Sequence, residues 1–192
     1  MRRVMGLVVI AVVMLAANLA WAASCFEVME EIQTRISWQV WNADGWAANP
    51  LLVEAVVTQN KKGPIPGMDN AKWKTVPESD AVVQGFIKNE VAQFLKEEMA
   101  NTDGICTGAF LNAAQGEKVA FTEKTGSYIH KGSAKFDAPF ASGKSWQGKP
   151  ELDDSGKVYE IQISVPVLSE GKPIGVLVVE LNGTKLEALS KK

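Results

Sequence analysis

The hydrophobic pattern of this chain changes its period once, close to Asp103 and Gly104. Before this point, apolar residues recur every three or four positions, as they do on one face of a helix. After it, apolar and polar residues alternate, which is typical of a strand with one buried face. The pattern therefore predicts a helical part over residues 26–100 and a sheet part over residues 105–182.

Three helices are expected in the helical part. The first covers residues 26–41, the second residues 50–60 and the third residues 80–100. Glycine and proline interrupt residues 62–67 and predict a loop between the second and third helices. The N-terminal caps are expected at Asn49 for the second helix and at Ser79 for the third.

Two hairpins are expected in the sheet part, joined by a long crossing loop over residues 123–154 that includes a short helical turn near residues 133–140. The first hairpin has strands at 105–111 and 118–122, and the second has strands at 159–167 and 174–181. The last strand is apolar on both faces, which favours a central place in the sheet. This order predicts an α+β fold, in which the long N-terminal helices pack on one side of an antiparallel sheet.

The first residues have the pattern of a signal peptide. Arg2 and Arg3 precede an apolar run, and Ala20 and Ala22 place small residues where signal peptidase requires them. The run has about 16 residues, fewer than the roughly 20 that span a bilayer. We expect cleavage after Ala22, so that residues 1–22 are removed and the protein is periplasmic or secreted.

Lipid anchoring is the alternative at this end of the chain. Small residues precede Cys25, as they do in bacterial lipoprotein signals. Those signals usually have leucine three residues before the cysteine, where this chain has Ala22. Cleavage without lipidation is therefore the preferred interpretation.

Residues 23–192 have the size of a single domain. Removal of Arg2 and Arg3 changes the net charge from −2 for the whole chain to −4 for the mature domain. Its lysines are scattered rather than clustered, so nothing indicates a nucleic-acid partner.

Two cysteines, Cys25 and Cys106, remain in the mature chain. An even number of cysteines in an exported domain predicts a disulfide between them. Two buried free thiols are the alternative. The pair is too distant in the sequence, and has too few companions, to predict a metal site.

Three motifs in the second half resemble one known family. The first is LNAAQGEKVA over residues 111–120, and the second is TGSY over 125–128 followed by AKF over 134–136. The third and most specific is IQISVPV over 161–167 followed by GKPIGVL over 171–177. Together these motifs resemble the Cache (PDC-type) family of extracytoplasmic sensor domains.

The resemblance implies a PAS-like fold with a small-molecule pocket between the sheet and the crossing loop. It also implies a small polar metabolite as ligand, namely an amino acid, an amine or a short organic acid. Because no signalling module accompanies these motifs, the resemblance implies a free-standing sensor that signals through a separate partner. That partner is expected to be a membrane receptor or a second copy of the chain.

Seven residues are candidates for contact with the ligand. The aromatic, polar and charged side chains of the crossing loop are the first group, and polar residues of the closing strand are the second. The candidates are Tyr128, His130, Lys131, Trp146, Asp153, Gln162 and Ser164. Each also has a simpler interpretation: core packing for Tyr128, His130 and Trp146, and exposure to water for the others.

The chain has no arginine after Arg35, so the usual bidentate partner of a carboxylate is missing from the half that forms the pocket. This favours a zwitterion or a small neutral compound, with Asp153 available for an amine. No phosphate-binding loop, nucleophile elbow or cluster of histidines is present, so neither an enzyme nor a cofactor is predicted. A periplasmic interaction or assembly subunit without a ligand is the alternative function.

Overall fold

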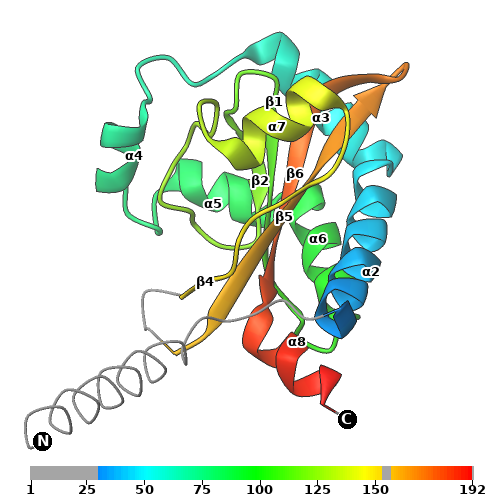
Figure 1. Cartoon of the computed structure of the whole chain (residues 1–192). Helices are drawn as coiled ribbons and strands as arrows, with labels where there is room; N and C mark the ends of the chain where they lie inside the picture. Colours follow the sequence, from blue (N-terminus) through cyan, green and yellow to red (C-terminus); the bar gives the residue numbers. More distant parts are fainter. Residues whose placement is uncertain (1–29, 153–156, 192) are drawn as a thin grey trace, which may run out of the picture.

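The computed structural model describes residues 30–152 and 157–191. Within these ranges, seven helices surround one antiparallel sheet of six strands (Figure 1). The expected signal peptide, Cys25 and Asp153 lie outside the described residues. None of the helices described is long and apolar enough to cross a membrane.

The elements follow each other in the order that the change of period predicts, helices before strands. The helices are α2 (Glu30–Ala47), α3 (Pro50–Lys62), α4 (Asn70–Thr75), α5 (Ala81–Lys88), α6 (Glu90–Ala100), α7 (Ala134–Ser142) and α8 (Gly183–Ser190). The strands are β1 (Cys106–Ala113), β2 (Lys118–Phe121), β3 (Trp146–Gln147), β4 (Glu151–Leu152), β5 (Tyr159–Ser169) and β6 (Lys172–Asn182).

The sheet has the strand order β2-β1-β6-β5-β3, and β4 also pairs with β5. Strand β6 lies between β1 and β5, which confirms the central place predicted for residues 174–181. The α+β fold class with an antiparallel sheet is confirmed as well. The short strands β3 and β4 of the crossing loop were not predicted from the sequence.

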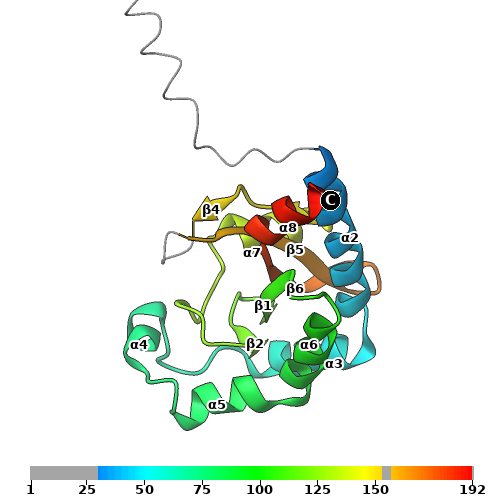
Figure 2. The ribbon, with the colours of Figure 1, turned by 90° about the horizontal axis from the view of Figure 1, so that it is seen from below.

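One face of the sheet carries the main hydrophobic core. The residues of β5 that the alternation marks as apolar, Ile161, Ile163 and Val165, are fully buried there. Helices α2, α3 and α6 supply the opposite wall of this core, in which Ile36 and Leu52 are fully buried. Figures 1 and 2 show α2 and α3 along this side of the sheet, as predicted for the long N-terminal helices.

The other face of the sheet carries a second, aromatic core. Phe110 of β1 and Val178 of β6 lie in it together with Trp73 of α4 and Phe136 of α7. Figure 2 shows α4 and α5 standing apart from α2, on the β2 side of the molecule. The sheet is therefore covered on both faces. Helix α7 corresponds to the short helical turn predicted near residues 133–140, whereas α4 was not predicted.

The single helix predicted over residues 80–100 is wrong, because Asn89 divides it into α5 and α6. The backbone of Asn89 is extended, and its side-chain oxygen accepts a hydrogen bond from Ala92 N–H at 2.9 Å, which caps α6. The cap of α5 is Asp80, which accepts a hydrogen bond from Val82 N–H at 2.8 Å, rather than Ser79. The break lets α5 pack on the aromatic core while α6 packs on the main core.

Helix α2 extends beyond the predicted end at residue 41. Its last turns continue to Ala47 because Trp46 and Ala47 are buried in the main core. Trp38 and Trp41 are instead 61% and 68% exposed and touch each other edge to face. Of the three tryptophans of α2, Trp46 alone lies in the core.

Gly116 fixes the start of the crossing loop against the first hairpin. Its φ is +82°, and a Cβ at this position would lie 2.3 Å from the backbone nitrogen of Lys131. The carbonyl of Gly116 accepts a hydrogen bond from His130 N–H at 2.8 Å. Glycine is therefore required here for the close approach of the loop that carries the predicted site.

Candidate functional site

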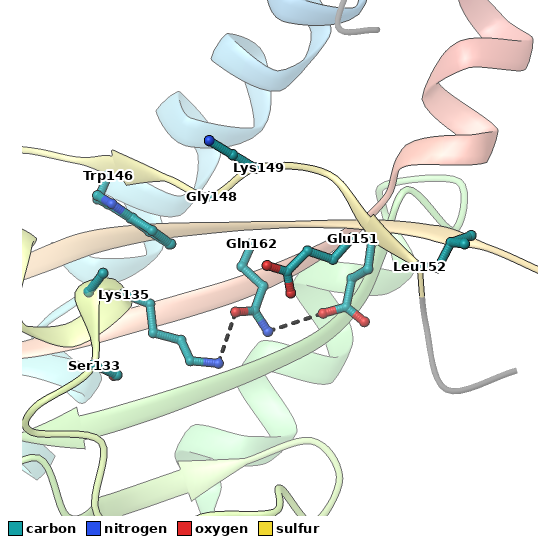
Figure 3. A pocket seen from close by; sticks show the side chains of 10 residues that line it. Ser133, Lys135, Trp146, Gly148, Lys149, Glu151, Leu152 and Gln162 are labelled. Atoms are coloured by element: carbon teal, nitrogen blue, oxygen red, sulfur yellow. Dashed lines mark hydrogen bonds between the residues drawn. The ribbon is translucent and has the colours of Figure 1, made fainter. Parts of the chain in front are cut away.

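An open cleft of about 750 Å³ lies over β5, between the first turn of α7 and the β3–β4 segment (Figure 3). Two predicted ligand residues, Trp146 and Gln162, line it. The complete lining is Ser133, Ala134, Lys135, Trp146, Gly148, Lys149, Glu151, Leu152, Glu160 and Gln162.

The alternation of β5 places Gln162 in this cleft. Its neighbours Ile161 and Ile163 point into the main core, so Gln162 projects from the opposite face. Trp146 reaches the cleft from β3, which pairs with β5 at Ser164. Lys135 comes from the first turn of α7, which Phe136 anchors in the aromatic core.

Gln162 joins the two charged sides of the cleft through its amide group. Its Oε1 accepts a hydrogen bond from Lys135 Nζ at 2.8 Å. Its Nε2 donates to Glu160 Oε1 at 3.1 Å and to Glu180 Oε1 at 3.2 Å. Figure 3 shows Lys135 and a carboxylate on either side of this amide. The amide is thus oriented by a cation on one side and by acids on the other.

The charges of the cleft are divided between its two walls. The positive wall is the first turn of α7, where Lys135 adds its charge to the positive end of the helix dipole. Ser133, the N-cap of α7, makes no side-chain capping hydrogen bond and also lines the cleft. The negative side holds Glu151 of β4 and Glu160 of β5, and Lys149, just before β4, adds one positive charge to the lining there. This arrangement suits a small ligand that carries both a carboxylate and an amine.

Glu180 of β6 lies under the negative side of the cleft. It pairs across the sheet with Gln162 on β5 and with Gly108 on β1. Burial, together with the charges of the nearby Glu160 and Glu123, raises the pKa of its carboxyl to about 7, although Lys135 and Lys118 oppose the shift. This acid therefore changes its charge close to neutral pH.

A group of buried polar side chains lies farther along the same face of the sheet. Lys118 is fully buried, and its Nζ lies 3.3 Å from the ring centroid of Phe110. Burial holds the pKa of Lys118 well below its usual value, and the charge of Lys135 contributes in the same direction. Within the described residues, hydrogen-bond partners are lacking for polar atoms of Asn112, Lys118, His130 and Ser164. Buried polar atoms are normally paired, so these atoms are an exception, and none of the four residues lines the cleft.

His130 belongs to this group. Its ring is 4.7 Å from that of Phe110 and only 6% of the residue is exposed. Burial lowers the pKa of His130 to about 2, assisted by the charges of Lys118 and Lys135. The imidazole is therefore neutral at physiological pH.

The other predicted residues have different surroundings. Tyr128 is fully buried in the aromatic core, packs on Trp73, and accepts a hydrogen bond from Ile65 N–H at 3.0 Å. The side chain of Lys131 is exposed. Ser164 is fully buried next to Trp146. Contact of any of the seven candidates with a ligand stays a prediction.

Sequence reasoning missed the charged residues of the cleft. Glu160 alternates with Gln162 and Ser164 on the polar face of the closing strand, and that spacing was the available signal. Lys135 is part of the AKF motif, but the direction of its side chain depends on how α7 packs on the sheet, and the sequence predicts only a short helical turn there. Glu180 precedes Leu181 near the end of an apolar strand, where a single acid carries no pattern.

Cys106 is a buried free thiol in the described part of the chain. Its Sγ donates to Gln39 Oε1 of α2 at 3.6 Å, and burial raises its pKa to about 11. Because Cys25 lies outside the described residues, the disulfide between these cysteines stays a prediction. Among the residues described, no group of histidines, cysteines and acids is arranged to hold a metal ion.

Comparison with solved structures relates this fold to bacterial sensor domains. The chain is similar to the sensor domain of the V. cholerae histidine kinase DctB, with a TM-score of 0.50 and 16% identity over 85% of this chain and 56% of that one. It is also similar to the sensory domain of the Campylobacter jejuni chemoreceptor Tlp3 with isoleucine bound (TM-score 0.45, 16% identity, 84% of this chain and 66% of that one). A third is the ligand-binding domain of the Pseudomonas fluorescens chemoreceptor CtaA with L-serine (TM-score 0.44, 17% identity, 82% and 55%).

This chain spans less than two thirds of each of those three chains. No family model matches the chain, and no curated protein matches it either. At this identity the similarity concerns the fold. The order of elements, the antiparallel sheet and the likeness to the DctB domain agree with the motifs quoted above. The chain has the PAS-like α+β fold of the Cache sensor domains.

Proposed function

We propose that this chain is an extracytoplasmic sensor domain that binds a small dipolar metabolite in the cleft over β5 and signals through a separate partner. The observation that carries the proposal is the pair of oppositely charged walls joined by Gln162. An amino acid matches both walls. An amine or a short organic acid would use one wall only.

The ligand's carboxylate would bind at Lys135 and the first turn of α7, and its amine at Glu160 and Glu151. Lysine replaces arginine as the partner of the carboxylate, since no arginine follows Arg35. The indole of Trp146 offers an apolar surface to the rest of the ligand. A cleft of about 750 Å³ falls within the range of small-molecule sites.

A thermal-shift screen of the mature chain against amino acids, amines and short organic acids tests this function. A ligand at a hundredfold excess over its dissociation constant stabilises the fold by about 2.7 kcal/mol. Lys135→Met should weaken binding of the compound found by about tenfold or more, because it removes the cation that the carboxylate meets. Lys131→Met is the matched control, since this exposed lysine lies just before α7 and outside the cleft.

The same pair of variants separates two placements of the site. Weaker binding in Lys135→Met alone supports the cleft. Weaker binding in Lys131→Met alone would contradict the cleft and support a site on the exposed part of the crossing loop.

An interaction subunit without a ligand is the second candidate. The exposed pair Trp38 and Trp41 on α2 favours it, because large aromatic side chains at the surface often mark protein contacts. A broad screen in which no compound stabilises the chain would favour this alternative.

We further propose export by the signal peptide, with a disulfide in the mature protein. The intact mass of periplasmic protein should correspond to a chain that begins at Ala23 and has lost the thiol hydrogens of Cys25 and Cys106. Full-length protein in the membrane would contradict the cleavage, and acyl groups on Cys25 would show the lipoprotein variant. Two thiols that react freely with iodoacetamide would contradict the disulfide.

A further inference from the structure

Three carboxyl groups from separate elements meet under the cleft. Glu180 comes from β6, Glu160 from β5, and Glu123 from the loop after β2. Glu180 and Glu160 share the single side-chain amide of Gln162 as donor. The position that a Cβ would take on Gly108 lies 2.3 Å from Glu180 Oε2 and 3.5 Å from Glu123 Oε1. The missing side chain at Gly108 thus provides the room in which two of the acids approach each other.

Two lysines face the same acid. Lys135 of α7 and Lys118 of β2 both act on Glu180, but neither forms a salt bridge with it at hydrogen-bonding distance. Lys135 donates to Gln162, and Lys118 lies over Phe110. The carboxyl of Glu180 therefore has acids on two sides and only an amide as its bonded neighbour.

We infer that Glu180 is the specificity-determining residue of the cleft, which by gaining or losing one proton sets whether the cleft favours anionic or cationic ligands. This inference rests on the proposed function. Glu180 would not need to touch the ligand, because it acts on the cleft through Gln162 and through its charge.

The charge of Glu180 determines how the preference of the cleft changes with pH. Burial and the neighbouring acids raise the pKa of Glu180 to about 7, so the carboxyl is neutral in slightly acidic solution. The positive charge of Lys135 is then less compensated, which favours an anion. Above neutral pH the ionised Glu180 adds a negative charge beside Glu160, which favours a cation and repels an anion.

Acetate and ethanolamine are suitable probes, since each keeps its charge between pH 6 and pH 8. Their dissociation constants would be measured with the mature chain by titration followed by NMR. We expect acetate to bind about fivefold more tightly at pH 6 than at pH 8, and ethanolamine about fivefold more tightly at pH 8. This ratio is what a pKa of about 7 gives between the two pH values when it changes by one unit on binding.

Glu180→Gln keeps the shape of the neutral acid and should remove both pH effects, leaving acetate with its affinity at pH 6. Glu97→Gln is the control, because it removes the same charge from the exposed face of α6. Binding that does not vary with pH, or that varies equally in Glu180→Gln, would overturn the inference and leave the proposed function standing. Absence of binding of either probe at both pH values would overturn the inference, whereas the proposed function is decided by the thermal-shift screen.

A second readout needs no ligand. The side-chain carboxyl resonance that disappears in Glu180→Gln should titrate near pH 7, and the side-chain NH₂ signals of Gln162 should shift with the same midpoint. A midpoint at the value of an ordinary glutamate, about 4.3, would overturn the inference whatever the probes do.

Discussion

Replacement of Trp73 by alanine is expected to destabilise the fold by about 3–5 kcal/mol, because it removes a large side chain from a closed core. Trp73 is fully buried and packs on Tyr128, Phe86 and Phe121. Its indole N–H also donates to the carbonyl of Thr125 at 2.7 Å, which would lose its partner. Urea unfolding followed by circular dichroism measures the loss.

Trp41→Ala is the matched control. The same atoms are removed, but Trp41 is 68% exposed, so its free energy of unfolding should change by no more than about 0.5 kcal/mol. If the two variants lost similar stability, the aromatic core would not hold the crossing loop and α4 on the sheet as described.

Replacement of Gly175 by alanine is expected to cost about 1–3 kcal/mol, the usual range for an overpacked core. A Cβ on Gly175 would lie 2.4 Å from the carbonyl oxygen of Asn112 and 2.8 Å from Val56 Cγ1. The carbonyl belongs to the backbone of β1, which pairs with β6 beside this point, so it cannot move without disturbing the ladder. Thermal unfolding of the variant measures the effect.

Gly126→Ala provides the comparison for this variant. No atom lies within 4 Å of a Cβ at Gly126, which is in the crossing loop. We expect its unfolding temperature to be within a few degrees of wild type, in keeping with a change below about 0.5 kcal/mol. An equally stable Gly175→Ala would show that β1 and β6 do not approach as closely as described.

The sheet was largely predictable because apolar and polar residues alternate along its strands in the sequence. Ile161, Ile163 and Val165 alternate with Gln162 and Ser164, and burial follows this alternation. The central place of β6 follows from residues that are apolar on both faces. These features depend on local pattern and therefore need no knowledge of the rest of the chain.

The second face of the sheet was less predictable because its residues come together only in the folded chain. Trp73, Phe110 and Tyr128 are far apart in the sequence, and no period connects them. The break at Asn89 is a capping event inside an apparently continuous apolar stripe. Tyr128 is predicted from the sequence as a ligand contact, whereas its ring lies in the aromatic core against Trp73 of α4, a helix that was not predicted.

In the candidate site too, residues placed by a local sequence pattern were predicted, and residues placed by packing were not. Trp146 and Gln162 line the cleft, and both were foreseen from the crossing loop and from the polar face of the closing strand. The position of Lys135 depends on how α7 packs on the sheet. The raised pKa of Glu180 depends on its burial and on the nearby Glu160. Neither packing nor burial of a single charged residue is visible in a sequence pattern.

The indole N–H signals of the mature chain offer the most direct test of the cleft. Five tryptophans remain after residue 22, so five such signals are expected in a two-dimensional ¹H–¹⁵N spectrum. On titration with the compound that stabilises the chain in the thermal screen, the Trp146 signal should shift most, together with the side-chain NH₂ signals of Gln162. A response centred on Trp38 and Trp41, with Trp146 and Gln162 unchanged, would contradict a ligand site over β5.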